Sequence, residues 1–314
     1  MQRLVASGYF FVIIAALGFS FKSILAKFAY GYGVDAMTLM LMRVSISVPL
    51  ILITLFWVEG RGAFRVTAKE VLLLAFMGIV GLGCAMLFSF YSLELIDASL
   101  STLVVYTYPA LTVAMLLFFY KEKAGPGKLI SLAITFMGLV MVVRADHFDF
   151  LALNIMGVVF ALIAAFSFAV YNVLSEKALK HISPIRVTAY CMVFLGGFFG
   201  LLFQGGPYPA DFTVWGLAAL LAIFSGFLPF ILFLYGIKRI GAARTSIVGS
   251  IGPVFTVLWA YMLLGERLDT VQLSGMAMVV LGVMTLKLAD PLRLAVKSGV
   301  VKEEMVMLGR EDEG

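Results

Sequence analysis

The chain has 314 residues, of which 62% are hydrophobic and only 13% are charged, whereas about 25% charged residues are usual in soluble proteins. A mean hydropathy of +1.07 and 28 Phe residues agree with this. Such a composition excludes a soluble globular domain and a disordered chain, because neither carries so much apolar surface. The formal net charge of +5 does not indicate nucleic-acid binding, since the basic residues lie at the ends of apolar runs. We therefore expect a polytopic membrane protein.

Ten apolar runs approach the length of about 20 residues that a helix needs to cross a bilayer. The first run follows Arg3 but lacks a small-x-small cleavage site, so we interpret it as a retained helix and not as a signal peptide. The sequence thus predicts an all-α integral membrane protein with ten transmembrane helices. The predicted spans are residues 6–28, 37–57, 69–91, 98–119, 128–144, 154–175, 187–204, 214–236, 243–264 and 271–289.

The distribution of Lys and Arg predicts the orientation of these spans. With a cytoplasmic N-terminus, 18 of the 23 Lys and Arg residues fall on the cytoplasmic side and only three, Lys27, Arg144 and Arg267, on the outer side. The remaining two, Lys22 and Arg43, lie within spans. One missed span would disturb this alternation. We therefore expect a multi-pass protein of the plasma (inner) membrane with the N-terminus and the C-terminus cytoplasmic.

The second half of the chain repeats the first at an offset of 144 residues. The matched pairs include Tyr91 and Tyr235, Pro109 and Pro253, Glu122 and Glu266, and Gly138 and Gly282. Paired Pro, Glu and Gly in one register are not expected by chance, even in apolar sequences. Each half holds five spans, and because five is odd, the second copy crosses the membrane in the opposite direction. Two inverted five-helix repeats are typical of secondary transporters.

These features resemble the EamA-type transporters of the drug/metabolite transporter superfamily. The resemblance rests on the ten spans in two halves, on Arg43 early in the second span, and on Pro109 followed by Glu122, which Pro253 and Leu264-Gly265-Glu266-Arg267 echo. It covers about residues 6–289. One departure lies in the first span, where members often have Trp-Gly-Ser/Thr-Asn and this chain has Leu17-Gly18-Phe19-Ser20.

The resemblance implies a carrier of small metabolites, such as amino acids, sugars, nucleotide derivatives or drugs, with a central cavity between the halves. We accordingly expect residues 1–147 to form the first EamA-like repeat and residues 148–290 the second. Residues 291–314 would be a cytoplasmic tail, which we expect to be disordered.

Proline and glycine interrupt spans at matching places in the two halves, and such interruptions indicate a transporter's binding region. One span contains Tyr106-Thr107-Tyr108-Pro109 and its partner contains Ser250-Ile251-Gly252-Pro253. Each proline leaves the carbonyl four residues earlier without its helical partner. These positions are either packing kinks, which are common in membrane helices, or hinges beside a cavity. We favour hinges at Pro109 and Pro253.

Polar side chains within the apolar spans are the candidates for a substrate site, because a hydroxyl or amide in hydrocarbon needs a hydrogen-bond partner and turns inward. Each one is individually more often a tie between helices than a ligand contact. Tyr171 and Asn172, in mid-span, are the strongest candidates. The predicted cavity residues are Lys22, Tyr91, Ser101, Tyr108, Tyr171, Asn172, Tyr235 and Thr245.

Lys22 and Arg43 are the two cations that lie well inside a span, each roughly 10 Å from the outer end of its helix. A lipid-facing charge at the bilayer centre costs about 3 kcal/mol. Lys22 either extends to the interface along its aliphatic stem or faces a vestibule where it attracts an anionic group; both interpretations stay open. For Arg43 we favour a structural role, because the resemblance places an Arg there in members with different substrates.

Catalytic and metal-binding patterns are missing from the sequence. It has no paired carboxylates, no phosphate-binding Gly-Lys-Ser/Thr and no Cys/His dyad, and Cys84 and Cys191 lack the spacing of a metal site. We therefore expect no enzyme activity, no metal and no cofactor. No Asp or Glu lies in mid-span, and His147 and His181 fall in loops. Because proton antiport usually needs a titrating group inside the membrane, we expect a uniporter, an exchanger, or a carrier that couples through an atypical group.

The function that these observations favour is secondary transport of a small metabolite by alternating access, in the direction of export. Aromatic and small polar residues outnumber charges in the candidate cavity, which suits a neutral or zwitterionic solute such as an amino acid. The alternative is a drug or lipid transporter of the same fold, including a flippase. The expected partners are the small-molecule substrate and the lipid bilayer. A monomer is compatible with the sequence, which does not determine the oligomeric state.

Overall fold

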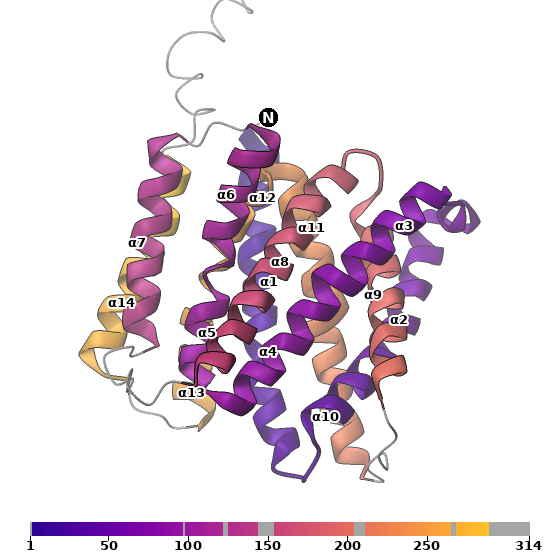
Figure 1. Cartoon of the computed structure of the whole chain (residues 1–314), viewed down its shortest axis with the longest axis horizontal. Coiled ribbons are helices and arrows are strands. Elements are labelled where there is room, and N and C mark those ends of the chain that lie inside the picture. The colour runs from indigo at the N-terminus through magenta and orange to yellow at the C-terminus, as the bar shows by residue number, and fades with distance from the viewer. Residues whose placement is uncertain are drawn as a thin grey trace, which may run out of the picture.

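The computed structural model describes residues 2–96, 98–121, 125–143, 154–203, 211–264 and 268–288, and these segments form a bundle of helices without strands (Figure 1). The predicted tail, residues 291–314, lies outside the described residues. The first half of the chain contains α1 (Gln2–Tyr30), α2 (Ala36–Glu59), η1 (Arg61–Phe64), α3 (Ala68–Phe76), η2 (Met77–Gly83), α4 (Cys84–Leu95), α5 (Ala98–Val105), α6 (Tyr108–Tyr120) and α7 (Pro126–Val142). The second half contains α8 (Ile155–Ala178), α9 (Pro184–Leu202), α10 (Phe212–Ala222), η4 (Ile223–Phe227), α11 (Leu228–Ile240), α12 (Ala242–Gly249), α13 (Gly252–Leu264) and α14 (Thr270–Leu288).

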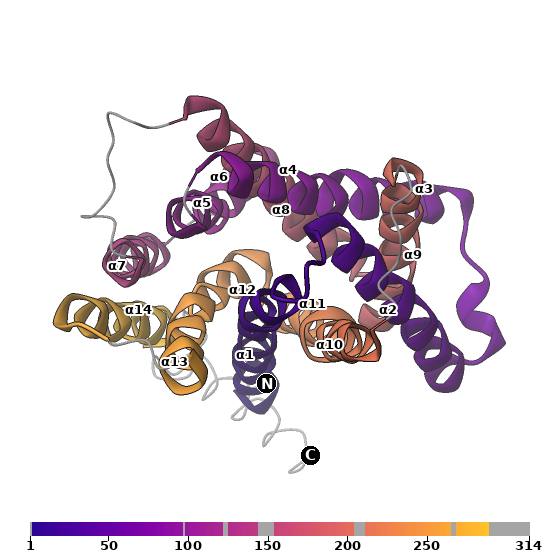
Figure 2. The same cartoon turned by 90° about the horizontal axis from the view of Figure 1, so that it is seen from below.

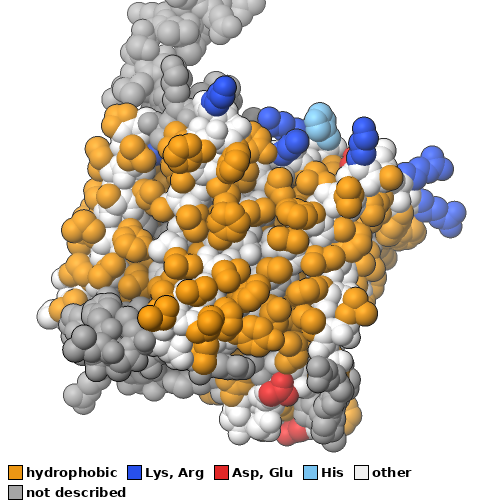
Figure 3. Space-filling model, in the orientation of Figure 1, with side chains coloured by type: hydrophobic (Ala, Val, Ile, Leu, Met, Phe, Trp, Pro, Cys, Tyr) orange, Lys and Arg blue, Asp and Glu red, His pale blue; other side chains and the backbone are white. Residues whose placement is uncertain are grey.

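Eight helical segments of the described chain are long and apolar enough to cross a membrane, and α7 and α14 supply two shorter apolar helices. The all-helical membrane fold is therefore confirmed. Large apolar side chains cover the outside of the bundle (Figure 3), including Trp57 with 84% of its surface exposed and Phe212 with 90%. Exposing so much apolar surface to water would be unfavourable, whereas contact with lipid tails is not.

Local capping determines where the helices begin. A side-chain oxygen just before the helix accepts hydrogen bonds from the free backbone N–H groups of its first turn, which satisfies donors that have no partner within the helix. α3 begins with a capping box in which Thr67 and Glu70 bond each other's backbone N–H. The residues that cap their own helices in this way are Asp35 before α2, Asn154 before α8, Ser183 before α9 and Asp211 before α10.

The principal helix pairs join the two halves of the chain. α1 packs against α11 and α8 packs against α4, while α2 pairs with α9 and α7 with α14. Figure 2 shows α7 and α14 together at one edge of the bundle and α2 and α9 at the other, as does Figure 1. In the α7–α14 pair, Ser131 donates to the Gly282 carbonyl at 2.6 Å. A Cβ on Gly138 would lie 2.7 Å from the Val279 nitrogen, so glycine is needed for this close approach.

Charged groups gather at the two ends of the bundle (Figure 3), and Lys and Arg are concentrated along one edge. We call the end that carries the α2–α3, α8–α9 and α11–α12 loops the basic end. Two contacts tie helices of opposite halves together there. Arg186 donates to Glu59 from Nε at 3.1 Å and Nη2 at 2.7 Å, and Arg239 donates to the hydroxyl of Ser7.

Candidate transport site

Four of the candidate spans are interrupted within the described residues. The third and eighth spans contain the π-helical segments η2 and η4. The fourth span divides into α5 and α6 at Tyr106 and Thr107, and the ninth into α12 and α13 at Ser250 and Ile251. The interruptions that the sequence predicts ahead of Pro109 and Pro253 are therefore present, whereas the hinge role stays a prediction.

The interruptions of the fourth and ninth spans lie against each other. The Tyr108 hydroxyl donates to the Ser246 carbonyl at 3.2 Å and lies 2.9 Å from where a Gly249 Cβ would be. The Tyr106 hydroxyl lies 2.7 Å from where a Gly252 Cβ would be. Two glycines thus make room for two tyrosines of the other half. The two interruptions are therefore in direct contact.

Aromatic rings line the interior beside this contact. The Tyr108 ring meets the Phe168 ring edge to face at a centroid distance of 4.8 Å, and Phe168 stacks on Phe233 at 6.1 Å. Tyr171 is fully buried, and its ring lies 6.4 Å from that of Phe230. These rings come from α6, α8 and α11, so elements of both halves build one apolar wall.

Asn172 and Thr245 are fully buried polar residues of this region. Neither the amide of Asn172 nor the hydroxyl of Thr245 has a hydrogen-bond partner within the described part of the chain. An unpaired buried polar group costs about 1–3 kcal/mol. Such groups are rare in native proteins and have a specific cause, such as a functional role or an ordered water or ion. The sequence singled out both residues, and the structure places them among the least satisfied groups of the interior.

Arg43 is only 4% exposed and lies against η4. Its guanidinium donates to the Ser225 carbonyl at 2.6 Å. That carbonyl lacks a helical partner because Pro229, four residues later, has no N–H. One turn along α2, Ser47 lies close to the Ala222 carbonyl at 3.4 Å. Arg43 thus replaces a backbone donor that the proline removed, which is a physical reason to bury a cation here.

Small residues let neighbouring helices reach η4. Gly226 departs from helical geometry, with φ −101° and ψ −117°, and its Cβ would lie 2.9 Å from the Ser47 hydroxyl. On the other side, a Cβ on Gly18 of α1 would lie 2.6 Å from both the Phe224 carbonyl oxygen and Pro229 Cγ. The interruption is therefore held between α1 and α2.

Lys22 differs from Arg43 in its surroundings. The Lys22 side chain on α1 is exposed, whereas Arg43 is buried and bonded to the backbone. The structure thus separates two cations that the sequence places at one depth: one is engaged in holding a helix, and the other is accessible.

The other predicted residues lie at separate places. Tyr91 is 40% exposed, and its ring lies 5.7 Å from that of Phe160. Ser101 is buried and accepts a hydrogen bond from Ser92 at 2.8 Å, which ties α5 to α4. Tyr235 is half-buried, with its ring 5.7 Å from a phenylalanine of α1. Tyr108, Tyr171, Asn172 and Thr245 therefore share the interior, and these three residues do not join them.

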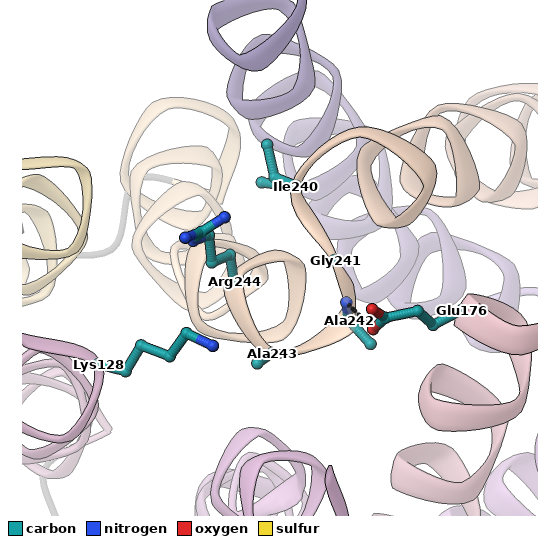
Figure 4. A pocket seen from close by; sticks show the side chains of 7 residues that line it. All are labelled: Lys128, Glu176, Ile240, Gly241, Ala242, Ala243 and Arg244. Carbon is teal, nitrogen blue, oxygen red and sulfur yellow. Dashed lines mark hydrogen bonds between the residues drawn. The ribbon is translucent and has the colours of Figure 1, made fainter. Parts of the chain in front are cut away.

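A hollow of about 250 Å³ opens at the basic end, and the sequence did not indicate it (Figure 4). Its only acidic lining residue is Glu176, whose carboxylate accepts from the Ala242 N–H at 2.6 Å. Lys128 and Arg244 lie on the other side of the start of α12. A span-end glutamate gives no sequence signal for this role, because its partner belongs to another helix. The lining residues are Lys128, Glu176, Ile240, Gly241, Ala242, Ala243 and Arg244.

The described residues contain no group of three or more His, Cys, Asp or Glu side chains that could hold a metal ion. Cys191 is buried and Cys84 is half-buried, both as free thiols. The chemistry that this interior offers is therefore hydrogen bonding and aromatic contact.

The interrupted helices, the apolar exterior and an interior whose buried polar groups, among the described residues, are uncharged apart from Arg43 fit a helical, multi-pass membrane protein of the transporter class. Comparison with known proteins identifies the family: the model of the EamA-like transporter family matches residues 6–144 and again residues 155–288. The chain belongs to the EamA-like transporter family.

Relatives of similar length support this assignment. Over 283 residues the chain is 26% identical to YcbK of Bacillus subtilis (strain 168), covering 87% of this chain and 90% of that protein. It is 27% identical over 291 residues to YyaM of the same organism, covering 87% and 92%. Both are described as uncharacterized transporters. A crystal structure with 21% identity superimposes with a TM-score of 0.78 over 92% of this chain and 99% of the other, which shows a shared fold.

Proposed function

We propose that the chain is a secondary transporter that exports a small neutral or zwitterionic metabolite, such as an amino acid, by alternating access. In this proposal ten helices form two inverted five-helix repeats, residues 1–147 and 148–290. The helix pairing supports it, since the first helix of each half packs against the third span of the other half. The family model also matches the chain twice, once in each half. Inverted halves can exchange conformations and so open to each side in turn.

The observation that carries the proposal is the contact between the two interrupted spans at Tyr108, Gly249 and Ser246. Interrupted helices that meet inside the bundle give a carrier both a hinge and exposed backbone groups near its centre. Pro109 and Pro253 are the proposed hinge positions.

The chemistry of the interior supports an uncharged or zwitterionic solute. Among the buried side chains of the described residues, Arg43 is the one charged group, and a backbone carbonyl already binds it. The remaining buried polar groups are hydroxyls and one amide. Such groups bind a solute by hydrogen bonds and do not compensate a full net charge. We propose transport without proton coupling for the same reason.

The positive-inside rule supports placing the basic end in the cytoplasm, with both termini on that side. The membrane of this proposal is the plasma (inner) membrane.

The experiment that tests the proposal is counterflow in proteoliposomes with a panel of amino acids, sugars and organic anions, with and without a proton gradient. Uptake of a neutral or zwitterionic class without the gradient supports the proposal. Uptake that requires the gradient overturns the uncoupled mechanism. If no solute of the panel is taken up, the proposed metabolite class is overturned and the alternative, a drug or lipid transporter, is favoured.

A matched pair of variants links transport to the interior. Tyr108→Phe removes the hydroxyl that donates to Ser246, so we expect slower counterflow. Tyr261 of α13 is 53% exposed, and Tyr261→Phe makes the same chemical change on the outside of the bundle. Equal effects of the two substitutions would contradict the assignment of the interior as the transport site.

A further inference from the structure

The start of α12 is capped by a residue of another helix. The position that normally caps a helix is occupied here by Gly241, which has φ +82° and no side chain to accept a hydrogen bond. The carboxylate of Glu176, at the end of α8, accepts from the Ala242 N–H at 2.6 Å instead. A Cβ on Gly241 would lie 3.4 Å from this carboxylate. The Ala242 N–H, one of the free donors at the start of α12, therefore keeps this partner only while α8 stays beside it.

This arrangement differs from the side-chain caps at five other helix starts of the described chain, including the capping box of α3. α2, α8, α9 and α10 are capped by the residue that directly precedes each helix, so their caps survive any movement between helices. A borrowed cap breaks when the two helices separate. A carboxylate at a helix N-terminus is also favoured by the helix dipole, which strengthens the contact while it is made.

Asn172 lies directly behind this contact. It is four residues from Glu176 and four from Phe168, so all three share one face of α8. Phe168 packs on Tyr108, and Tyr108 bonds the Ser246 carbonyl of α12. Asn172 is therefore enclosed between two contacts of α8 with the α12 region. Its amide finds no partner among the described residues although it is fully buried.

Thr245 is a second unpaired polar residue close to the Glu176–Ala242 contact. It lies three residues after Ala242, within the first turn of α12, and its hydroxyl also has no partner among the described residues. Its side chain lies beside Gly236 of α11, 3.5 Å from where a Cβ would be. An uncharged amide and hydroxyl at this level offer donors and acceptors that nothing in this conformation uses.

We propose that the Glu176–Ala242 bond is the latch of a gate at the basic end, and that Asn172 and Thr245 are solute-binding groups that the closed gate covers. The inference deepens the proposed function and rests on it. When α12 moves away from α8, the latch breaks and the two groups gain partners from the solute and from water. The ligand class is a neutral or zwitterionic solute that both donates and accepts hydrogen bonds. The hollow lined by Glu176, Lys128 and Arg244 is the opening of this gate toward the solvent at the basic end (Figure 4).

Thiol accessibility tests the gate without knowledge of the substrate. Cys84 and Cys191 are replaced by Ala, and Asn172→Cys introduces a single thiol. A membrane-impermeant methanethiosulfonate reagent is then added to right-side-out or to inverted vesicles. We expect slow labelling of the latched protein from both faces. With Glu176→Ala, labelling from the basic end should be about tenfold faster, since one helix cap contributes roughly this factor to the equilibrium between closed and open forms.

Two further variants make the result specific. Ala242→Pro removes the donor of the latch from the other helix, at the first helical position where proline is well tolerated; it must also accelerate labelling. Glu70→Ala removes a carboxylate that caps α3 within its own capping box, and it must leave the labelling rate of the introduced thiol unchanged.

Three results overturn the gate: fast labelling of the latched protein, a Glu176→Ala rate equal to the parent, or acceleration by Glu70→Ala as well. If Glu176→Ala does not fold, Ala242→Pro alone decides between the parental and the faster rate. Failure of counterflow with all solutes, together with the expected labelling pattern, would overturn the proposed function and leave the gate standing. Intact counterflow with unchanged labelling would overturn only the gate.

Discussion

The third and eighth spans are both interrupted, but by different chemistry. In η2 three glycines alternate with larger apolar residues, and Gly78 lets the backbone approach Cys191, where a Cβ would lie 2.8 Å from the carbonyl oxygen. In η4 the backbone leaves helical geometry at Gly226, and Pro229 removes a donor that Arg43 replaces from α2. The interrupted backbone of η2 is thus stabilised by close packing, and that of η4 by a hydrogen bond from another helix.

This difference teaches that the two interruptions have different weaknesses. η2 depends on the shape of its neighbours and tolerates no added volume. η4 depends on one long-range donor and tolerates no loss of it. Substitutions at the two interruptions should therefore have different effects.

The largest expected effect is that of Arg43→Met. It leaves the Ser225 carbonyl buried without a donor, so we expect the free energy of unfolding in detergent to fall by roughly 1.5–3 kcal/mol, the range for a hydrogen bond to a charged group. Pro229→Ala restores an N–H that the carbonyl can use. In the Pro229→Ala background the cost of Arg43→Met should therefore shrink, as a double-mutant cycle would show. Equal costs in both backgrounds would contradict the role of Arg43.

An added methyl group should destabilise η2 more than η4, the reverse of the order expected for loss of the Arg43 hydrogen bond. Gly78→Ala brings a Cβ within 2.8 Å of the backbone of α9, which must move, so we expect a loss of about 1–3 kcal/mol of stability. Gly226→Ala meets the Ser47 hydroxyl, which can rotate away, and the Leu221 carbonyl oxygen at 3.3 Å, which needs only a small shift, so it should cost less. Thermal unfolding of the two variants checks the order, and the reverse order would break the comparison.

Two buried serines, one in each interrupted span, give a further test of the difference between η2 and η4. The Ser225 hydroxyl in η4 is buried and has no partner among the described residues, so Ser225→Ala should be neutral or stabilise the protein by up to about 1 kcal/mol. Ser92 in α4, which follows η2, donates to Ser101 at 2.8 Å. Ser92→Ala should cost about 1 kcal/mol. Denaturation curves of the two variants measure this; a loss with Ser225→Ala would show that the hydroxyl has an essential role in the folded state.

The smallest effect concerns the helix that leads into η4. The backbone N–H and the hydroxyl of Thr213 hold the pKa of the Asp211 carboxyl below its usual value. A depressed folded-state pKa stabilises the protein above the unfolded pKa of about 3.9, and this contribution disappears as the pH falls through the lower folded value. We expect Asp211→Ala to lower the melting temperature slightly at neutral pH and not at pH values below both pKa values. A difference that persists at low pH would exclude this cap as the cause.

Much of the fold follows from the sequence because its causes are local. The apolar runs predict the helices, and the prolines at 109 and 253 predict interruptions where the structure has them. The same rule applied to Pro229 would have indicated a free carbonyl at Ser225. No local rule indicates the donor, because Arg43 is 182 residues away. Glu176 is a similar case: a glutamate at a span end gives no sign that it caps another helix.

The sequence by itself determined the membrane class, the number of apolar runs and the places where helices break, since hydropathy and a missing N–H are properties of single residues. The tertiary structure alone decided which polar groups pair across the bundle. A helix can turn any face toward its neighbours, and the packing of side chains such as Tyr106 on Gly252 selects that face. This selection produces the contact between the fourth and ninth spans, the hydrogen bond from Arg43 to η4, and the unpaired amide of Asn172.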